Sequence, residues 1–71
     1  MRLFYEDYKN GYVNVIDNVD KVKIEKHERV NYLYAHTNVG YTRVGKLADI
    51  GLAYMVDVSD KDYKEYFRYE K

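Results

Sequence analysis

The sequence predicts a mainly β protein, and three features of its 71 residues support that prediction. Tyrosine and β-branched residues dominate most segments, apolar residues alternate with polar ones over short runs, and Gly or Asn separates the runs. We expect a β+α architecture, in which a small antiparallel sheet or barrel of about five strands is followed by a short C-terminal helix. Residues 1–71 should form a single domain, because a chain of this length builds one core.

The first two strands are predicted on either side of an Asn-Gly turn. Residues 2–8 are rich in aromatic side chains, and they lead into Asn10-Gly11. This dipeptide is the strongest short signal for a hairpin, because both residue types tolerate positive φ angles. Residues 12–16 then read as a strand with two partly apolar faces, and residues 17–18 offer a bend or bulge.

The clearest alternation covers residues 21–26. Val22 and Ile24 lie on one face of this predicted strand, and the opposite face carries Lys21, Lys23 and Glu25. We therefore expect the face with Val22 and Ile24 to be buried and the charged face to contact water.

A turn at residues 26–29 should lead into a strand over residues 30–36. Period-two spacing places Tyr32 and Tyr34 on one face of this strand. The opposite face carries Asn31, Leu33 and Ala35. A turn at residues 38–40 should follow.

Residues 41–47 read as a further strand, in which Gly45 suggests a bulge or a close approach of another backbone. A short corner at residues 48–51 leads into a last strand over residues 52–58. Helices over residues 42–56 and 17–36 are the alternative, but glycine costs roughly 1 kcal/mol inside a helix. The β interpretation is therefore favoured.

The spacing changes after residue 58. Ser59 and Asp62 have the form of a capping box, and Tyr63, Tyr66 and Phe67 follow at helical spacing. This pattern predicts the short C-terminal helix.

Two segments resemble known families. Residues 31–60, "NYLYAHTNVGYTRVGKLADI" and "LAYMVDVSD", resemble the second half of an SH3-like barrel, which implies two strands, a one-turn corner and a final strand. The tryptophans and proline that form the peptide groove of SH3 domains are missing, so binding of proline-rich ligands does not carry over. The pattern "YVNVIDNVDKVKIE", in a composition rich in Lys, Tyr and Asn, is similar to small accessory proteins of phages and prophages of Gram-positive bacteria. That resemblance implies a regulator or inhibitor of a host or rival system.

The sequence contains no recognisable catalytic, cofactor or metal signature. His27 and His36 have no third ligand at a suitable spacing, and metal sites usually need three or four ligands. The glycines form no phosphate-binding fingerprint. We therefore expect no enzymatic activity, no cofactor and no metal. No apolar run suggests a signal peptide or a membrane span, so the expected location is the cytoplasm.

Ten tyrosines in so short a chain cannot all be buried. We expect Tyr12, Tyr32, Tyr54 and Tyr66 to complete the core. The remaining tyrosines suit a partner surface, because tyrosine gives a large contact area and keeps a hydroxyl for water. The expected partner-binding residues are Tyr5, Tyr8, Tyr34, Tyr41, Arg43, Tyr63 and Tyr69.

The sequence therefore predicts a module that binds another protein. Its twelve basic and twelve acidic residues cancel, which argues against binding that depends mainly on neutralising phosphates. The sharper form of this hypothesis is an inhibitor or regulator of a bacterial host or defence protein, and association into a homodimer is another form. The alternative is a small β-barrel that binds single-stranded nucleic acid by stacking bases on Tyr32 and Tyr34. Lys21, Lys23, Arg29, Arg43 and Lys46 would then contact phosphates.

Overall fold

The computed structural model describes residues 1–56 and the backbone of residues 63–68. These residues form strands β1 (Arg2–Asp7), β2 (Tyr12–Ile16), β3 (Lys21–His27), β4 (Val30–Thr37), β5 (Gly40–Lys46), β6 (Ile50–Val56) and β7 (Tyr63–Arg68), and one 3₁₀ helix, η1 (Leu47–Asp49).

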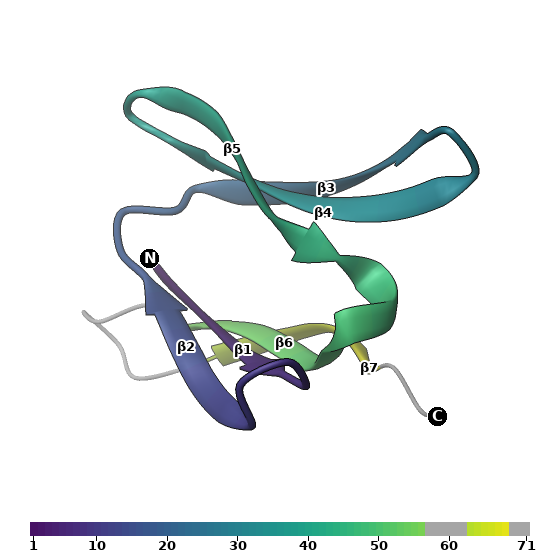
Figure 1. Ribbon diagram of the computed structural model, residues 1–71. Helices are drawn as coiled ribbons and strands as arrows, with labels where there is room; N and C mark the ends of the chain where they lie inside the picture. The colour runs from purple at the N-terminus through teal and green to yellow at the C-terminus, as the bar shows by residue number, and fades with distance from the viewer. Residues whose placement is uncertain (57–62, 69–71) are drawn as a thin grey trace.

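The strands form two antiparallel sheets, which lie one above the other in Figure 1. One sheet has four strands in the order β2-β1-β6-β7, and the other has three in the order β3-β4-β5. The predicted mainly β antiparallel class is confirmed. The described strands form two separate sheets rather than a closed barrel, and they number seven rather than about five.

The core lies between the two sheets. Its buried residues come from both of them and from their connections: Leu3, Val19, Leu33, Ala35, Ile50, Ala53 and Met55. Tyr5, Ile16, Val22 and Val44 pack against this cluster. Each sheet thus buries one face, and period-two spacing leaves the other face outside.

The predicted turns are present, and local side chains explain their geometry. Gly11 has a φ of 75°, and its N–H donates to the carbonyl of Asp7 at 2.8 Å. Asn10 accepts a hydrogen bond from the N–H of Tyr12 at 2.8 Å. At the predicted bend, Asn18 has a φ of 60°, a conformation that asparagine tolerates, and the next residue is the buried Val19.

The second half of the chain follows the predicted order of strand, turn, strand, one-turn corner and strand. The pairing of β4 with β5 shifts register between Leu33 and Tyr34, which places the expected bulge beside Gly45. A Cβ on Gly45 would meet nothing within 4 Å, so no close approach of another backbone requires glycine at this position. The helical alternatives over residues 17–36 and 42–56 are wrong, because these residues form β3 to β6.

The predicted C-terminal helix is also wrong. Residues 63–68 form strand β7, which pairs with β6 and places Phe67 opposite Ala53 and Tyr63 opposite Val56. The apolar residues of this segment have helical spacing, but a helix this short is marginal without tertiary support. Pairing with the open edge of β6 satisfies the backbone instead. The expected cap at Ser59 and Asp62 lies outside the described residues.

Other expectations about burial need correction. Tyr54, expected in the core, is half-buried and lies outside the core cluster, where it pairs with Phe4. Tyr12, expected in the core, is 72% exposed because it begins β2 at the hairpin end of the sheet. Ile24 is half exposed, whereas its neighbour Val22 packs against the core as expected.

Candidate functional site

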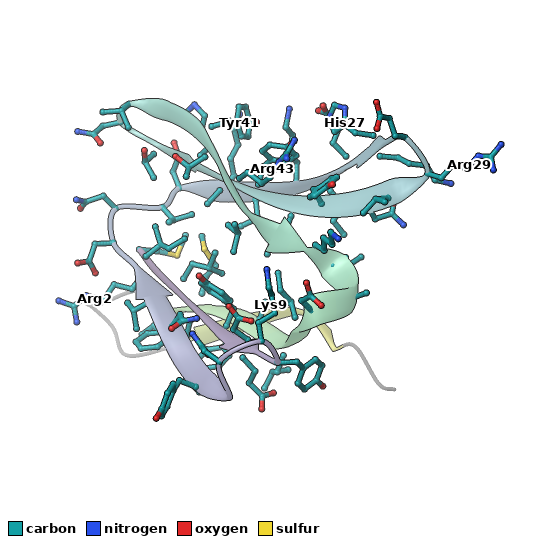
Figure 2. The ribbon with its side chains drawn as sticks, in the orientation of Figure 1. Arg2, Lys9, His27, Arg29, Tyr41 and Arg43 are labelled. Carbon is teal, nitrogen blue, oxygen red and sulfur yellow. The ribbon has the colours of Figure 1, made fainter. Side chains whose placement is uncertain are left out.

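One outer sheet face collects tyrosines and cations from three strands. Lys23 lies opposite Tyr34 and Tyr34 opposite Arg43, and directly paired residues share a face. Leu33 and Ala35 alternate with these residues and are fully buried on the other side. We call this surface the tyrosine face, and it consists of Lys21, Lys23, Glu25, His27, Tyr32, Tyr34, His36, Tyr41 and Arg43. Figure 2 shows Tyr41, Arg43 and His27 on the side of this sheet that faces away from the rest of the molecule.

Arg43 joins two tyrosines of β4. Its guanidinium carbon lies 4.1 Å from the centroid of the Tyr32 ring, within the range of a cation–π contact. Its Nε and Nη2 donate hydrogen bonds to the hydroxyl of Tyr34 at 3.3 and 3.1 Å. The hydrogen bond with Tyr34 raises the pKa of Arg43. The side chain is therefore held in one place although it is exposed.

Lys23 plays a similar part for the third tyrosine. Its ammonium nitrogen lies 4.1 Å from the centroid of the Tyr41 ring and 5.6 Å from that of Tyr34. It also forms an ion pair with Glu25 at 2.8 Å. Hydrogen bonding between these two groups raises the pKa of Lys23 and lowers the pKa of Glu25.

Each histidine on this face contacts a single carboxylate. His27 Nε2 lies 2.8 Å from Glu25, and His36 Nδ1 lies 2.8 Å from Asp20. The hydrogen bond with His36 lowers the pKa of Asp20. His36 also packs edge-on against Tyr41, with ring centroids 4.8 Å apart. Among the residues that the structure describes, no three acidic or histidine side chains gather in a metal-binding arrangement.

The structure brings together three of the predicted partner-binding residues, namely Tyr34, Tyr41 and Arg43. Tyr5 lies elsewhere, since it packs against the core on the inner face of the four-stranded sheet, where burial raises its pKa. Tyr8 lies in the turn between β1 and β2, next to Gly51.

The last two predicted partner-binding residues belong to the C-terminal part of the chain. The structure describes the backbone of Tyr63, which begins strand β7. Tyr69 lies outside the described residues.

Other members of the tyrosine face were not predicted as partner-binding residues. The sequence predicts Tyr32 in the core, although period-two spacing places it on the same face as Tyr34. Lys23 and His27 also belong to this face. The alternation of residues 21–26 places Lys23 on a solvent-exposed face. No local pattern shows that this face and the face of Tyr34 form one surface. The pairing of β3 with β4 makes that connection.

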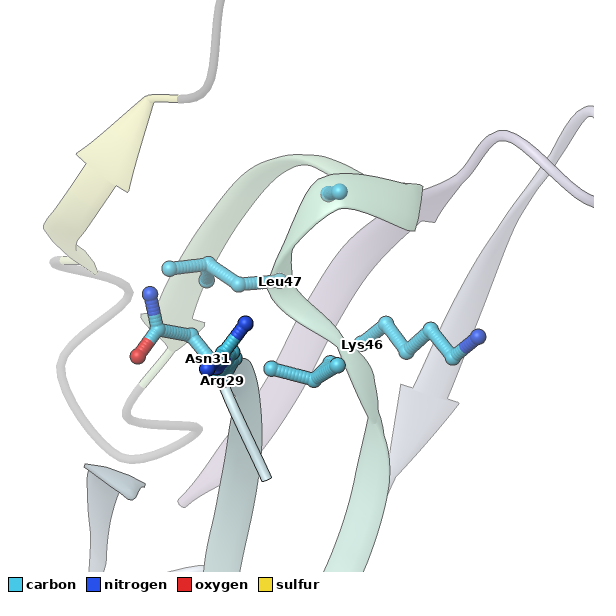
Figure 3. A pocket seen from close by; sticks show the side chains of 6 residues that line it. Arg29, Asn31, Lys46 and Leu47 are labelled. Carbon is cyan, nitrogen blue, oxygen red and sulfur yellow. The ribbon is translucent and has the colours of Figure 1, made fainter. Parts of the chain in front are cut away.

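A pocket lies at one end of the three-stranded sheet, lined by Arg29, Val30, Asn31, Lys46, Leu47 and Ala48. Arg29 comes from the turn between β3 and β4, where Glu28 and Arg29 have φ angles of 51° and 70°. Figure 3 shows the Lys46 side chain extending away from Arg29, so these two cations do not converge on one point.

Comparison with protein-family models, curated proteins and solved structures finds no match for this chain. Within the described residues, no helix has the length and apolar character needed to cross a membrane.

Proposed function

We propose that this protein is a non-enzymatic binding module that docks its tyrosine face on another protein. The observation that supports the proposal is the grouping of Tyr32, Tyr34, Tyr41 and Arg43 on one outer sheet face. Tyrosine and arginine are the residue types most enriched, with tryptophan, among those that dominate binding energy in protein interfaces.

The contacts within the face add to this argument. Arg43 is held by Tyr32 and Tyr34, and Lys23 lies over Tyr41. Immobilising a long side chain on binding costs about 0.5–1.5 kcal/mol. Arg43 and Lys23 already have fixed partners in the free protein, so they should lose less conformational entropy on binding.

The charge of the face indicates the chemistry of its partner. Lys21, Lys23 and Arg43 carry three positive charges against the single negative charge of Glu25, with Asp20 at the margin. A partner surface with apolar groups and a few carboxylates would complement it. The resemblance to phage accessory proteins supports a bacterial host or defence protein as the partner.

The experiment compares capture by three immobilised proteins: the wild type, Arg43→Ala and Arg2→Ala. Arg2 is a matched control, because it is an exposed arginine with an ion pair, to Asp17 at 3.0 Å, on the other sheet. A protein from a Gram-positive bacterial lysate should bind the wild type and Arg2→Ala in equal amounts and should bind Arg43→Ala much less.

Purified partner should then show a Kd that rises about 30-fold for Arg43→Ala, which corresponds to about 2 kcal/mol. Failure to recover a stoichiometric partner, or equal binding by both variants, would contradict the proposal.

Binding of single-stranded nucleic acid is the second candidate, and the interleaving of Lys21, Lys23 and Arg43 with the tyrosines favours it. Two contacts count against it. The ring of Tyr32 is covered by Arg43, and that of Tyr41 is covered by Lys23. A base that stacked on the covered face of either ring would first have to displace a cation. Protein binding uses the same side chains without that rearrangement.

An oligonucleotide titration separates the two candidates. Binding of a labelled mixed-sequence strand that saturates, weakens with salt and falls in Tyr34→Ala would favour the nucleic-acid function. Absence of binding at low salt would remove it.

A further inference from the structure

Strand β2 differs from the other sheet edges in its lack of charge. Among the described strands, four lie at sheet edges: β2 and β7 in one sheet, and β3 and β5 in the other. Three of these contain charged residues: Lys21, Lys23, Glu25 and Lys26 in β3, Arg43 and Lys46 in β5, and Lys64, Glu65 and Arg68 in β7. The sequence of β2, YVNVI, has no charged residue.

Proteins normally protect their sheet edges with charges, prolines or bulges. The chain has no proline, and β2 pairs with β1 in a regular register from Leu3–Ile16 to Asp7–Tyr12. Strand β2 therefore contains no charged residue, no proline and no bulge that would protect its edge. No other described strand pairs with the outer side of β2, so the backbone groups there that have no side-chain partner are open to another strand.

The side chains of β2 add apolar surface at this edge. Val13 and Val15 are 54% and 48% exposed on the outer face of the four-stranded sheet. Val15 lies opposite Phe4, whose ring stacks on Tyr54 with centroids 5.4 Å apart. An added strand would cover both valines.

We infer that β2 is the contact site for a second copy of this chain, with the two β2 strands antiparallel about a two-fold axis at Asn14. Self-complementarity argues for this occupant. With Asn14 on the axis, all five residues pair, and Val13 of each copy lies opposite Val15 of the other. No charged residues face each other within the paired strands.

Other registers fit less well. A shift of one residue would put the valines on the wrong face of the combined sheet, and a shift of two would lose pairs. In the favoured register, two four-stranded sheets join into one sheet of eight strands.

The dimer should be weak. Two paired strands of five residues bury less than the roughly 1,200 Å² of a standard interface. We therefore expect a monomer–dimer equilibrium with a dissociation constant in the micromolar range or above. The tyrosine face lies on the other sheet, so this inference does not depend on the proposed function.

Sedimentation velocity over a range of protein concentrations tests the association. The wild type should shift from monomer towards dimer as the concentration rises, and Val15→Lys should remain a monomer because it adds a charge to the edge. Val39→Lys is the matched control, since Val39 is 84% exposed in the turn between β4 and β5. A monomeric wild type, or a dimer that Val15→Lys leaves unchanged, would overturn the inference.

Cysteine cross-linking tests the register, and the natural chain contains no cysteine. Residues directly opposite each other in antiparallel strands have Cα atoms about 4.5–5.5 Å apart, which a disulfide can span. A mixture of Val13→Cys and Val15→Cys proteins should therefore form mixed disulfides quickly. Each protein alone should cross-link slowly, because its two cysteines would be diagonal neighbours about 7–8 Å apart. Equal rates in all three samples would exclude this register.

Discussion

Gly51 is the position where one added methyl group should test the packing of the β1–β2 hairpin. It lies buried in β6, outside the left-handed region of φ, so alanine can adopt its backbone conformation. A Cβ at this position would lie 2.7 Å from the hydroxyl oxygen of Tyr8, 2.9 Å from its Cζ and 3.2 Å from Oε1 of Glu6. The first two distances are too short for unbonded atoms. Tyr8 must therefore move in Gly51→Ala.

Two opposing effects set the change in unfolding free energy that Gly51→Ala should cause. Overpacking costs about 1–3 kcal/mol, and replacing glycine by alanine recovers about 0.4–1 kcal/mol by restricting the unfolded chain. Tyr8 is 42% exposed, and its hydroxyl is the far end of a flexible side chain, so we use the lower part of the first range. Gly51→Ala should destabilise the wild type by about 0.5–1 kcal/mol and should stabilise Tyr8→Ala by about 0.5 kcal/mol.

Denaturant unfolding of the wild type, the two single variants and the double variant, followed by circular dichroism, gives the coupling energy. It should be about 1–1.5 kcal/mol. Gly45→Ala is the control, because its Cβ would meet nothing within 4 Å and its φ is also outside the left-handed region. It should be neutral or slightly stabilising. If Gly51→Ala changed the unfolding free energy equally in the wild type and in Tyr8→Ala, the proposed contact between Tyr8 and residue 51 would be refuted.

Three further predictions concern the core and two titrating groups. Leu33→Ala should remove about 2–5 kcal/mol from a total of about 4–11 kcal/mol for a chain of this length, measured by denaturant unfolding. The hydrogen bond with His36 lowers the pKa of Asp20 in the folded protein. It should therefore stabilise the fold above the unfolded-state pKa of about 4, and this stabilisation should be lost as the pH falls through the pKa of the folded state. Asp20→Asn should therefore flatten the acid side of a plot of Tm against pH. Burial, with a smaller contribution from Asp7, raises the pKa of Tyr5 in the folded protein. The neutral phenol should therefore stabilise the fold below a pH of about 10, and this stabilisation should be lost as the pH rises through the pKa of the folded state. Tyr5→Phe should reduce that alkaline loss of Tm.

The parts of the fold that could be predicted depend on local chemistry. Asn10-Gly11 specifies its own turn, and the alternation around Leu33 identifies the buried face of β4 without any knowledge of the partner strands. Gly45 gave a correct signal for the bulge in β5.

The errors arise where pairing decides the outcome. The apolar residues among 63–68 have the spacing of a helix, but pairing with the edge of β6 makes this segment a strand. Tyr12 and Tyr5 look equivalent in the sequence, but Tyr12 begins an edge strand and Tyr5 faces the core. The contact of Lys23 with Tyr41 requires two hairpins to be aligned, which no local pattern specifies.

The pairing of β1 with β6 has a consequence for the order of folding. Strands β3, β4 and β5 are joined by short turns, so their contacts can form locally and early. β1 and β6 pair residues 2–7 with residues 50–56, across most of the described chain. Closing so long a loop carries an entropic cost that local hairpins avoid. We therefore expect the β3-β4-β5 sheet to be formed in the folding transition state, and substitutions in the β1–β6 pair to act mainly on the unfolding rate.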